Sequence, residues 1–321
     1  MQTRTHHLLK QAAALYPFDM GTVRLIRSSN QSPNDIYDFT KDGKRYILRI
    51  ATHTESHTHK TVGEMEWLAF LHVRGVPVSM PLPMRDGRMV ALLVSAELYH
   101  DVCAFEKAEG VHIDRNDPRR WNPEIAEDWG YTMGRMHRET KAFRDIRDAR
   151  GVFDGSDGPN DSLERVPEIQ AYARALVARL LALPCTPDTY GLIHCDFHQN
   201  NFFVHNNKVH VFDFDDSMYG YFALDIGIAL HHALIWGLPH DAVEKRQAEA
   251  ERVVARFMEG YRRANVLDAQ ACGSILWFMR YRQLCNFGWE YREDNPMVEE
   301  QRNLLEGFEV EGCRLTEGVF A

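Results

Sequence analysis

Hydrophobic and polar residues alternate between Thr22 and Tyr99, and this period of two is typical of half-buried strands. The alternation predicts strands at residues 22–29, 35–40, 45–50 and 89–98, with turns at Lys41-Asp42-Gly43 and Arg85-Asp86-Gly87. One helix, from about Thr58 to Arg74, interrupts these strands and ends at Gly75. We therefore expect a small lobe built on an antiparallel sheet.

Beyond about Gly110 the apolar residues recur at the spacing of helices. Asp161 with Glu164, and Asp241 with Glu244, have the spacing of an N-cap followed by an acidic third position. The predicted helices span residues 119–142, 164–183, 222–237, 241–264, 269–291 and 295–311.

These patterns predict an α+β protein with two lobes. Residues 1–103 would form the smaller lobe, residues 104–110 a hinge, and residues 111–321 a larger, mainly helical lobe. A ligand is expected in a cleft between the lobes, because binding sites are concave and often lie at domain interfaces.

The segment HCDFHQNNFFVHNNKVHVFDFDD, at residues 194–216, gathers histidine, aspartate and asparagine around two short apolar runs. The runs at 201–204 and 209–212 are strand candidates. Asn206-Asn207 is a suitable two-residue turn between them, because asparagine tolerates a positive φ angle. The segment is therefore predicted to fold as a hairpin.

The register of this hairpin places Asn201 beside Asp213 at its open end. Asp196 lies in the loop that leads into the first strand. An amide oxygen and two carboxylates offer hard oxygen ligands, which suit Mg²⁺ better than Zn²⁺. The sequence thus indicates a magnesium site at the open end of the hairpin.

Composition and charge narrow the classes of function. The chain has 321 residues, of which 45% are hydrophobic and 26% charged, as in ordinary globular proteins. A formal net charge of −9 without a block of basic residues argues against a nucleic-acid partner. Six cysteines form no CxxC pair, and neither a signal peptide nor an 18-residue apolar run is present. We expect a cytoplasmic protein with no membrane partner; the oligomeric state is left open.

The motifs in this segment resemble those of a known family. HCDFHQNN looks like the catalytic loop of the aminoglycoside phosphotransferase and choline kinase superfamily, usually H-G-D-x-x-x-x-N, and VFDFDDS resembles its second metal motif. Type II homoserine kinases are similar as well.

The resemblance implies a protein-kinase-like fold and ATP-dependent phosphorylation of a hydroxyl. Asp196 matches the catalytic base and His194 the catalytic-loop histidine. Asn201 and Asp213 match the Mg²⁺ ligands, and Asp225 matches an aspartate that braces the loop.

The smaller lobe resembles the nucleotide-binding half of a kinase. In YILRI, the alternation of a strand puts Ile47 and Arg49 on one face, at the positions of Ala and Lys in the kinase motif V-A-I-K. Ile47 would cover the adenine and Arg49 would reach the phosphates of ATP. Glu64 matches the acidic partner of Arg49, with Glu66 as the alternative because the helix register is not known from sequence. The family's hinge and adenine contacts fall on CAFEKAEG at 103–110, which adds Phe105, Glu106 and Lys107.

Three features depart from the family pattern. Asn200 stands in a glycine position, and we expect it to adopt a positive φ angle, which asparagine tolerates best after glycine. Cys195 also stands where glycine is usual, and its small side chain needs no chemical role. The loop SSNQSPND at 28–35 would cover the phosphates although it contains no glycine.

Other interpretations stay open at this point. Considered alone, His194 is more often structural than catalytic, and we keep a structural role for it. Asp196 with His198 has the look of a zinc hydrolase, but no further cluster of His and Cys has ligand spacing. The remaining alternatives are a protein kinase on the same fold and a nucleotide-binding module without turnover.

The acceptor is expected to be a small molecule that carries a hydroxyl and an amine, such as an amino alcohol, a hydroxy amino acid or an aminoglycoside. The acidic balance of the chain and aromatic residues on the last helices could form a pocket for a cation. Aromatic residues on helices are nevertheless more often part of a core. The candidate substrate residues are Asp215, Asp216, Trp277, Tyr281 and Trp289, with Glu290, Tyr291, Glu293 and Asp294 nearby in sequence.

Overall fold

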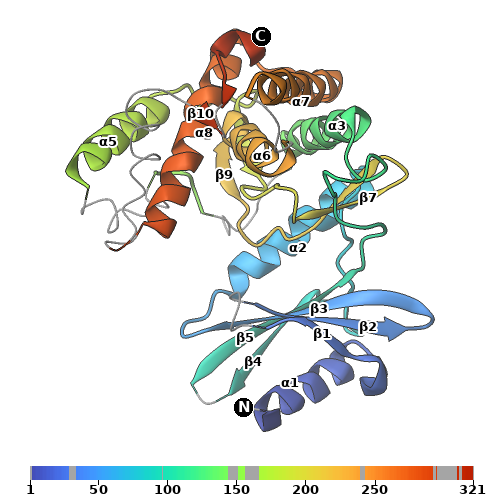
Figure 1. Ribbon diagram of the computed structural model, residues 1–321. Helices are drawn as coiled ribbons and strands as arrows, with labels where there is room; N and C mark the ends of the chain where they lie inside the picture. Colours follow the sequence, from blue (N-terminus) through green and yellow to red (C-terminus); the bar gives the residue numbers. More distant parts are fainter. Residues whose placement is uncertain are drawn as a thin grey trace. The chain divides into compact units, whose positions relative to one another are not determined.

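The chain forms two compact units, and each has its own secondary structure (Figure 1). The first unit runs from Met1 to Glu109 and also includes Phe143; the second comprises Gly110–Ala142 and the chain from Gly151 onward. The computed structural model describes residues 2–28, 34–95, 97–143, 151–155, 166–238, 243–291, 294, 309–310 and 313–320. Among these residues, no helix is long and apolar enough to cross a membrane.

An antiparallel sheet of five strands, in the order β1-β2-β3-β5-β4, forms the centre of the first unit. The prediction of one strand at 89–98 is wrong, because the chain reverses near Glu97, which has a φ of 63°. The second strand of this hairpin extends to Glu106, so that residues 104–106 of the predicted hinge belong to the sheet. The strands are β1 Arg24–Arg27, β2 Asn34–Lys41, β3 Lys44–His53, β4 Val90–Ser95 and β5 Leu98–Glu106.

Two helices accompany this sheet, and only the second was expected from sequence. Helix α1, Gln2–Leu15, contributes Leu8, Leu9 and Ala12 to the apolar core on the sheet. Helix α2, Thr58–Val73, has its first turn fixed by Asp101 of β5, whose carboxylate accepts hydrogen bonds from Thr58 and Thr61. A short 3₁₀ helix, Met20–Thr22, precedes β1.

The second unit is mainly helical, as predicted. The prediction of a helix at 222–237 is confirmed. The ends of α3, α5, α7 and α8 lie at the predicted residue or a few residues inside it. Helix α3, for example, begins after Asn122, whose side chain accepts a hydrogen bond from the backbone N–H of Ile125. The helices are α3 Pro123–Thr140, α5 Pro167–Leu181, α6 Phe222–Gly237, α7 Val243–Ala264 and α8 Ala269–Glu290.

Short strands and a final 3₁₀ helix complete this unit. The pair β6–β9 was not predicted. At the predicted helix 295–311, Glu309–Val310 is a strand instead, and residues 295–308 lie outside the described residues. The predicted caps at Asp161, Glu164 and Asp241 also lie outside them. The elements are β6 Tyr190–Ile193, β7 Phe202–His205, β8 Lys208–Val211, β9 Met218–Tyr221, β10 Glu309–Val310, β11 Cys313–Arg314 and the 3₁₀ helix Glu317–Phe320.

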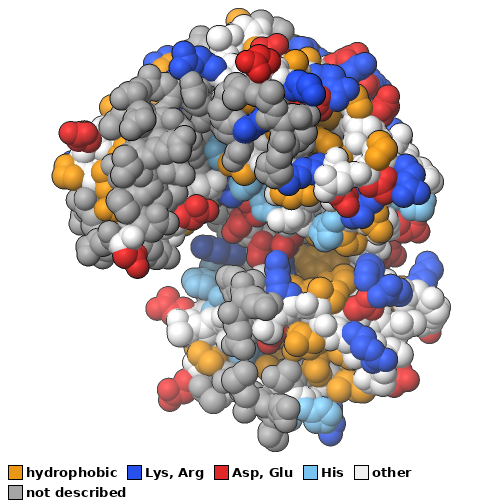
Figure 2. All heavy atoms as spheres, viewed as in Figure 1, with side chains coloured by type: hydrophobic (Ala, Val, Ile, Leu, Met, Phe, Trp, Pro, Cys, Tyr) orange, Lys and Arg blue, Asp and Glu red, His pale blue; other side chains and the backbone are white. Residues whose placement is uncertain are grey.

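Charged side chains of both signs are interspersed over the face of the molecule that Figure 2 shows. Neither blue Lys and Arg nor red Asp and Glu side chains form a continuous field there. The described side chains of this face therefore form no single-sign patch that would steer a polyanion.

Glycines allow α3 and α7 to cross at backbone distance. A Cβ atom on Gly130 would lie 1.9 Å from the carbonyl oxygen of Phe257, and one on Gly260 would lie 1.8 Å from that of Glu127. Side chains cannot fit at either position, so the two helix backbones touch there. This crossing fixes α3, which supports the hairpin described below.

Gly130→Ala is expected to lower the free energy of unfolding by about 2 kcal/mol or more, because the helices must separate to admit the methyl group. The better helix propensity of alanine, worth about 1 kcal/mol, is too small to offset this cost. Urea denaturation measures the change. Gly151→Ala is the control, since nothing lies within 4 Å of its added Cβ. Equal unfolding midpoints for the two variants would contradict the close crossing.

Candidate active site

The hairpin formed by β7 and β8 carries the predicted metal ligands at its open end. Asn206 and Asn207 have φ angles of 52° and 58°, as a tight two-residue turn requires. Phe203 lies opposite His210, which confirms the predicted register. The backbone N–H of Phe212 donates to the carbonyl oxygen of Asn201 at 2.9 Å. Asp213 therefore follows directly after the residue that is bonded to Asn201.

The hairpin is held on both sides. Asp128 of α3 accepts hydrogen bonds from Lys208 Nζ at 2.7 Å and from the backbone N–H of Val209 at 2.9 Å. On the other side, Val204 and Val111 exchange backbone hydrogen bonds of 2.8 and 3.2 Å. A Cβ on Gly110 would lie 2.3 Å from the carbonyl oxygen of Val204, so only glycine allows this approach.

Asp196 lies at the centre of a set of directed hydrogen bonds. Its Oδ2 accepts from Asn201 Nδ2 at 2.9 Å and lies 3.2 Å from His198 Nε2. The backbone N–H of Asn200 donates to His198 Nδ1 at 3.1 Å, so that the proton of the neutral ring is on Nε2 and points to Asp196. The other oxygen, Oδ1, accepts from Arg282 Nη2 at 3.1 Å.

The charge of Asp196 follows from these contacts. Burial alone would raise the pKa of this carboxyl group, but the hydrogen bond from His198 and the positive charge of Arg282 outweigh burial. The pKa of Asp196 therefore lies below its usual value. Asp196 is ionised at neutral pH and can accept a hydrogen bond from a hydroxyl group.

His194 is a structural link between the catalytic loop and the second metal motif. Its side chain is fully buried and packs against the rings of Phe197 and Phe214, with centroids at 5.4 and 4.4 Å. Nδ1 accepts from the backbone N–H of Asp196 at 3.3 Å, and Nε2 donates to the carbonyl oxygen of Phe212 at 3.1 Å. Because the ring has no exposed surface, His194 is placed to orient Asp196 and not to touch a substrate.

Asp225 fixes the start of the catalytic loop. Its Oδ1 accepts from the backbone N–H of Cys195 at 2.9 Å, and Oδ2 accepts from that of His194 at 3.0 Å. His137 Nε2 also lies 3.0 Å from Oδ2. Burial lowers the pKa of His137, which therefore bonds Asp225 as a neutral ring. The expected role of Asp225 as a brace is seen directly in these contacts.

The loop conformation corrects one expectation. Asn200 does not have the positive φ angle predicted for it; Cys195 does, with a φ of 66°. The left-handed residue is needed at Cys195, where two successive N–H groups turn toward one carboxylate. Burial raises the pKa of the Cys195 thiol, so the group stays protonated and unreactive.

Asn201 is oriented as a ligand for a divalent cation would be. Its Nδ2 donates to both the carbonyl oxygen and Oδ2 of Asp196, each at 2.9 Å. The amide oxygen of Asn201 therefore points away from Asp196, and no donor among the described residues is bonded to it. Among these residues, no group of three or more His, Cys, Asp or Glu is arranged to hold a metal. An amide oxygen with the half-buried Asp213 is the donor set that suits a hard cation.

The predicted acceptor residues lie in different surroundings. Asp215 is half-buried and Asp216 exposed, whereas Tyr281 is buried with its ring 5.4 Å from that of Phe153. The Trp277 ring has the guanidinium of Arg179 at 3.5 Å and that of Arg280 at 5.1 Å. Trp289 is 49% exposed, and Arg282 lies 5.0 Å from its ring. Both tryptophans thus contact cations of the protein itself.

In the first unit, Arg49 and Glu64 form a buried ion pair. Arg49 Nη1 and Nη2 donate to the two carboxylate oxygens of Glu64 at 2.9 and 2.5 Å, a bidentate geometry. Both side chains are almost inaccessible, with 4% and 1% exposure. The choice of Glu64 over Glu66 as the partner of Arg49 is therefore confirmed.

The residues predicted to contact adenine lie along β3 and β5. Ile47 and Phe105 are direct cross-strand partners. Glu106 is exposed, and its backbone N–H donates to the carbonyl oxygen of Met80 at 2.8 Å. Lys107 Nζ donates to Asp38 Oδ2 at 2.5 Å. Most of the predicted phosphate loop, residues 29–33, lies outside the described residues.

Sequence reasoning missed two residues of the site, Arg282 of α8 and His232 of α6. Arg282 Nε donates to His232 Nε2 at 3.0 Å, while Arg282 Nη2 bonds Asp196. The signal was present in the sequence. Arg282 lies on the same helical stripe as the buried residues Phe278 and Cys285, so a charge interrupts an apolar face.

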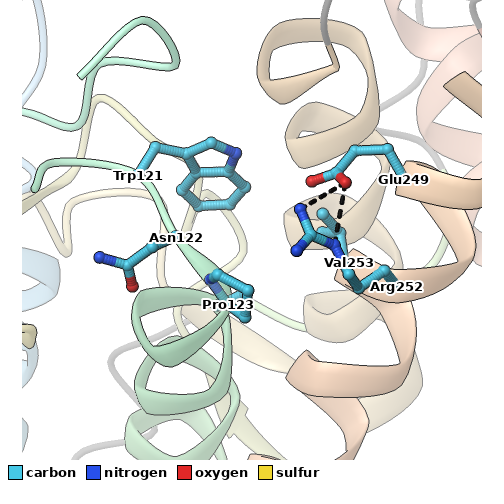
Figure 3. Close-up of a pocket in the computed structure, with 7 residues that line it drawn as sticks. Trp121, Asn122, Pro123, Glu249, Arg252 and Val253 are labelled. Carbon is cyan, nitrogen blue, oxygen red and sulfur yellow. Dashed lines mark hydrogen bonds and ion pairs between the residues drawn. The ribbon is translucent and has the colours of Figure 1, made fainter. Parts of the chain in front are cut away.

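A separate pocket lies where the start of α3 meets α7 (Figure 3). Trp121, Asn122 and Pro123 line one side of it, and Glu249, Arg252 and Val253 line the other. Glu249 and Arg252 form an ion pair with each other at 2.5 Å. None of the predicted site residues lines this pocket.

Asp225→Asn is expected to lower the free energy of unfolding by about 2 kcal/mol or more and to reduce activity. Asparagine keeps the volume, but its NH₂ group must face at least one of the buried N–H donors, which then has no acceptor. Thermal and urea unfolding measure the stability. Asp188→Asn, which removes the surface partner of Lys141, should cost less than about 0.5 kcal/mol. A stable, fully active Asp225→Asn would refute the bracing role.

Comparison with known proteins identifies the family. The profile of the phosphotransferase enzyme family matches residues 25–267. An amicoumacin kinase of Bacillus subtilis (strain 168) is 32% identical over 310 residues, which cover 94% of this chain and 90% of that protein. A solved amicoumacin kinase in complex with AMP-PNP, Ca²⁺ and Ami is 27% identical, with a TM-score of 0.80 over 94% of this chain and 91% of the other.

A solved microcompartment-associated aminopropanol kinase has a TM-score of 0.71 at 22% identity, over 97% and 99% of the two chains, and shares the fold. The predicted protein-kinase-like fold is thereby confirmed. The enzyme is a small-molecule kinase, and its family implies ATP and a divalent cation as cofactors. With a profile match over most of its length and a relative aligned almost end to end, the chain belongs to the phosphotransferase enzyme family.

Proposed function

We propose that this kinase transfers the γ-phosphate of MgATP to a hydroxyl group of a small molecule that also carries an amine. The observation that supports this assignment most directly is the geometry of Asp196. One of its oxygens is held by Asn201 and His198, while the other, Oδ1, accepts a single hydrogen bond from protein. A carboxylate oxygen accepts two, so Oδ1 can take a hydrogen bond from the acceptor hydroxyl.

Asp196 would orient that hydroxyl and receive its proton as the oxygen bonds to phosphorus. Phosphoryl transfer needs little covalent work from the protein, because positioning and charge neutralisation supply most of the rate enhancement. The proton has no onward path through His198, since Nε2 already carries a proton and Nδ1 accepts from Asn200. Asp196 would therefore hold the proton until product leaves.

Asn201 and Asp213 would hold Mg²⁺, which supplies positive charge to the phosphate oxygens when it is bound. The oriented amide oxygen of Asn201 supports this role. In the first unit, Arg49 would bind the phosphates, and the bidentate pair with Glu64 would hold it in place. Ile47 and Phe105, paired across β3 and β5, would pack against the adenine; Glu106 and Lys107 would lie beside it.

The amine in the acceptor is inferred from the relatives and from the acidic charge of the chain. A relative that is 32% identical is an amicoumacin kinase, so amicoumacin is the first acceptor to test. The half-buried Asp215 and the exposed Asp216 come two and three residues after Asp213 and would attract the amine. Arginines contact the rings of Trp277 and Trp289, and a core residue contacts that of Tyr281. These three residues would therefore support the acceptor site and not contact the acceptor itself.

ADP formation with candidate acceptors tests the proposal. Amicoumacin and 1-amino-2-propanol are expected to be phosphorylated faster than 2-propanol, which matches the second acceptor without its amine. Asp196→Asn should reduce kcat by about 10³-fold, within the usual range for a proton acceptor, and leave MgATP binding nearly unchanged. Equal rates with the neutral alcohol would refute the amine preference, and an active Asp196→Asn would refute the assignment of the base.

The metal assignment makes a separate prediction. Asp213→Ala should weaken binding of MgATP by about tenfold or more but leave binding of adenosine, which needs no metal, nearly unchanged. Calorimetric titration with AMP-PNP and with adenosine, each with and without Mg²⁺, measures both. An equal loss of affinity for the two ligands would indicate that Asp213 is only structural.

A further inference from the structure

Arg282 of α8 is held in one orientation beside Asp196. Its Nη2 donates to Asp196 Oδ1 at 3.1 Å and its Nε donates to His232 Nε2 at 3.0 Å. The ring of Trp289 lies 5.0 Å from its Cζ. Helices α6 and α8, which carry His232 and Arg282, pack along each other (Figure 1). A guanidinium with two directed bonds and a ring beside it is a rigid donor group.

Part of this guanidinium is still available for a ligand. Arginine has five N–H donors, and the bonds to Asp196 and His232 use two of them. For the other donors, on Nη1 and Nη2, no acceptor is found among the described residues. The side chain is 14% exposed. Because donors that are largely removed from water are costly to leave unpaired, this arrangement favours a ligand that brings an acceptor oxygen.

The position of these donors relates them to the reacting atom. Asp196 Oδ1 is the oxygen that can still accept a hydrogen bond, and Arg282 is bonded to this same oxygen. A hydroxyl bound at Oδ1 would therefore lie beside the guanidinium. The chemical group next to that hydroxyl in the acceptor would then lie close to the positive charge of Arg282, so it must be neutral or negatively charged.

His232 contacts Arg282 as a neutral ring. Its Nε2 accepts from Arg282 and so carries no proton. Burial and the charge of Arg282 lower the pKa of His232 to about 2, so the ring remains neutral. His231, the next residue, is also buried, and its pKa is lowered to about 3 by burial and by Arg282. Neither histidine ring therefore adds a positive charge beside Arg282.

We propose that Arg282 is a specificity-determining residue of the acceptor site: its N–H groups that have no acceptor among the described residues bind a carbonyl or carboxylate oxygen attached next to the carbon that bears the reactive hydroxyl. This inference rests on the proposed function and names the acceptor class more closely, as an α-hydroxy amide or α-hydroxy acid that carries an amine. The amine lies on the other side of the hydroxyl, because the guanidinium repels it.

A matched pair of acceptors tests the inference. In 3-amino-2-hydroxypropanamide a carboxamide replaces the methyl group of 1-amino-2-propanol, and the hydroxyl and amine stay in place. NMR titration of the enzyme with Mg²⁺ and AMP-PNP gives the dissociation constant of each probe. The amide is expected to bind at least about tenfold more tightly, as one charge-assisted hydrogen bond allows. ADP formation with ATP is measured on the same pair.

Variants assign the preference to Arg282. Arg282→Gln should bring the ratio of the two dissociation constants close to one, and Arg282→Lys, which keeps the charge but not the planar fork, should recover part of it. Arg256→Gln on α7, whose partners Glu127 and Glu259 are on the surface, should leave the ratio unchanged. The ratio is the useful quantity because a general loss of structure weakens both probes alike.

The outcomes are distinct. A tenfold preference that disappears in Arg282→Gln supports the inference. A wild-type ratio near one, a preference that survives in Arg282→Gln, or no binding of either probe overturns it. If the binding preference is present but neither probe yields ADP, the proposed function fails for these acceptors while the role of Arg282 in recognition stands.

Discussion

One carboxylate, that of Asp225, determines where the catalytic loop begins. It accepts hydrogen bonds from two successive backbone N–H groups and from neutral His137, and it has no exposed surface. Asn265 donates to Tyr261, whose hydroxyl lies 3.0 Å from His137 Nδ1. Asn265 Nδ2 can only donate, so the Tyr261 hydroxyl accepts from it and donates to His137 Nδ1. The proton of the His137 ring is then on Nε2 and points to Asp225. The loop that carries Asp196 is therefore supported by α3, α6 and α7 together.

Two of the ion pairs among the described residues, one in each unit, differ in kind. Arg49 and Glu64 are bidentate and almost inaccessible, so removal of either partner would leave a buried charge. Arg282 and Asp196 share one hydrogen bond and are 14% and 20% exposed. The first pair fixes a side chain in place, whereas the second can exchange part of its bonding with a ligand. The contrast separates a supporting interaction from one that takes part in recognition.

The sequence predicted features that depend on local rules. The Asn206-Asn207 turn and the alternation on either side of it were enough for the hairpin register, and the resemblance to the family motif indicated Glu64 as the partner of Arg49. The boundary between β4 and β5 was missed because residues 89–98 contain no glycine or proline to mark a turn. Positive φ at Cys195 and the contact of Arg282 with Asp196 depend on α6, which is distant from both in sequence. These features arise from tertiary packing between distant segments, so the residue pattern of a single segment cannot predict them.

The bridge between Val111 and Val204 has a consequence for the predicted metal site. It adds a third extended segment to the β7–β8 hairpin, directly after the residue at which the first unit ends. A side chain on Gly110 would clash with the carbonyl oxygen of Val204, so the close approach of the two backbones requires glycine at this position. The first residues of the second unit are therefore paired with the strand that follows Asn201, so a side chain at position 110 would disturb this predicted metal ligand through β7.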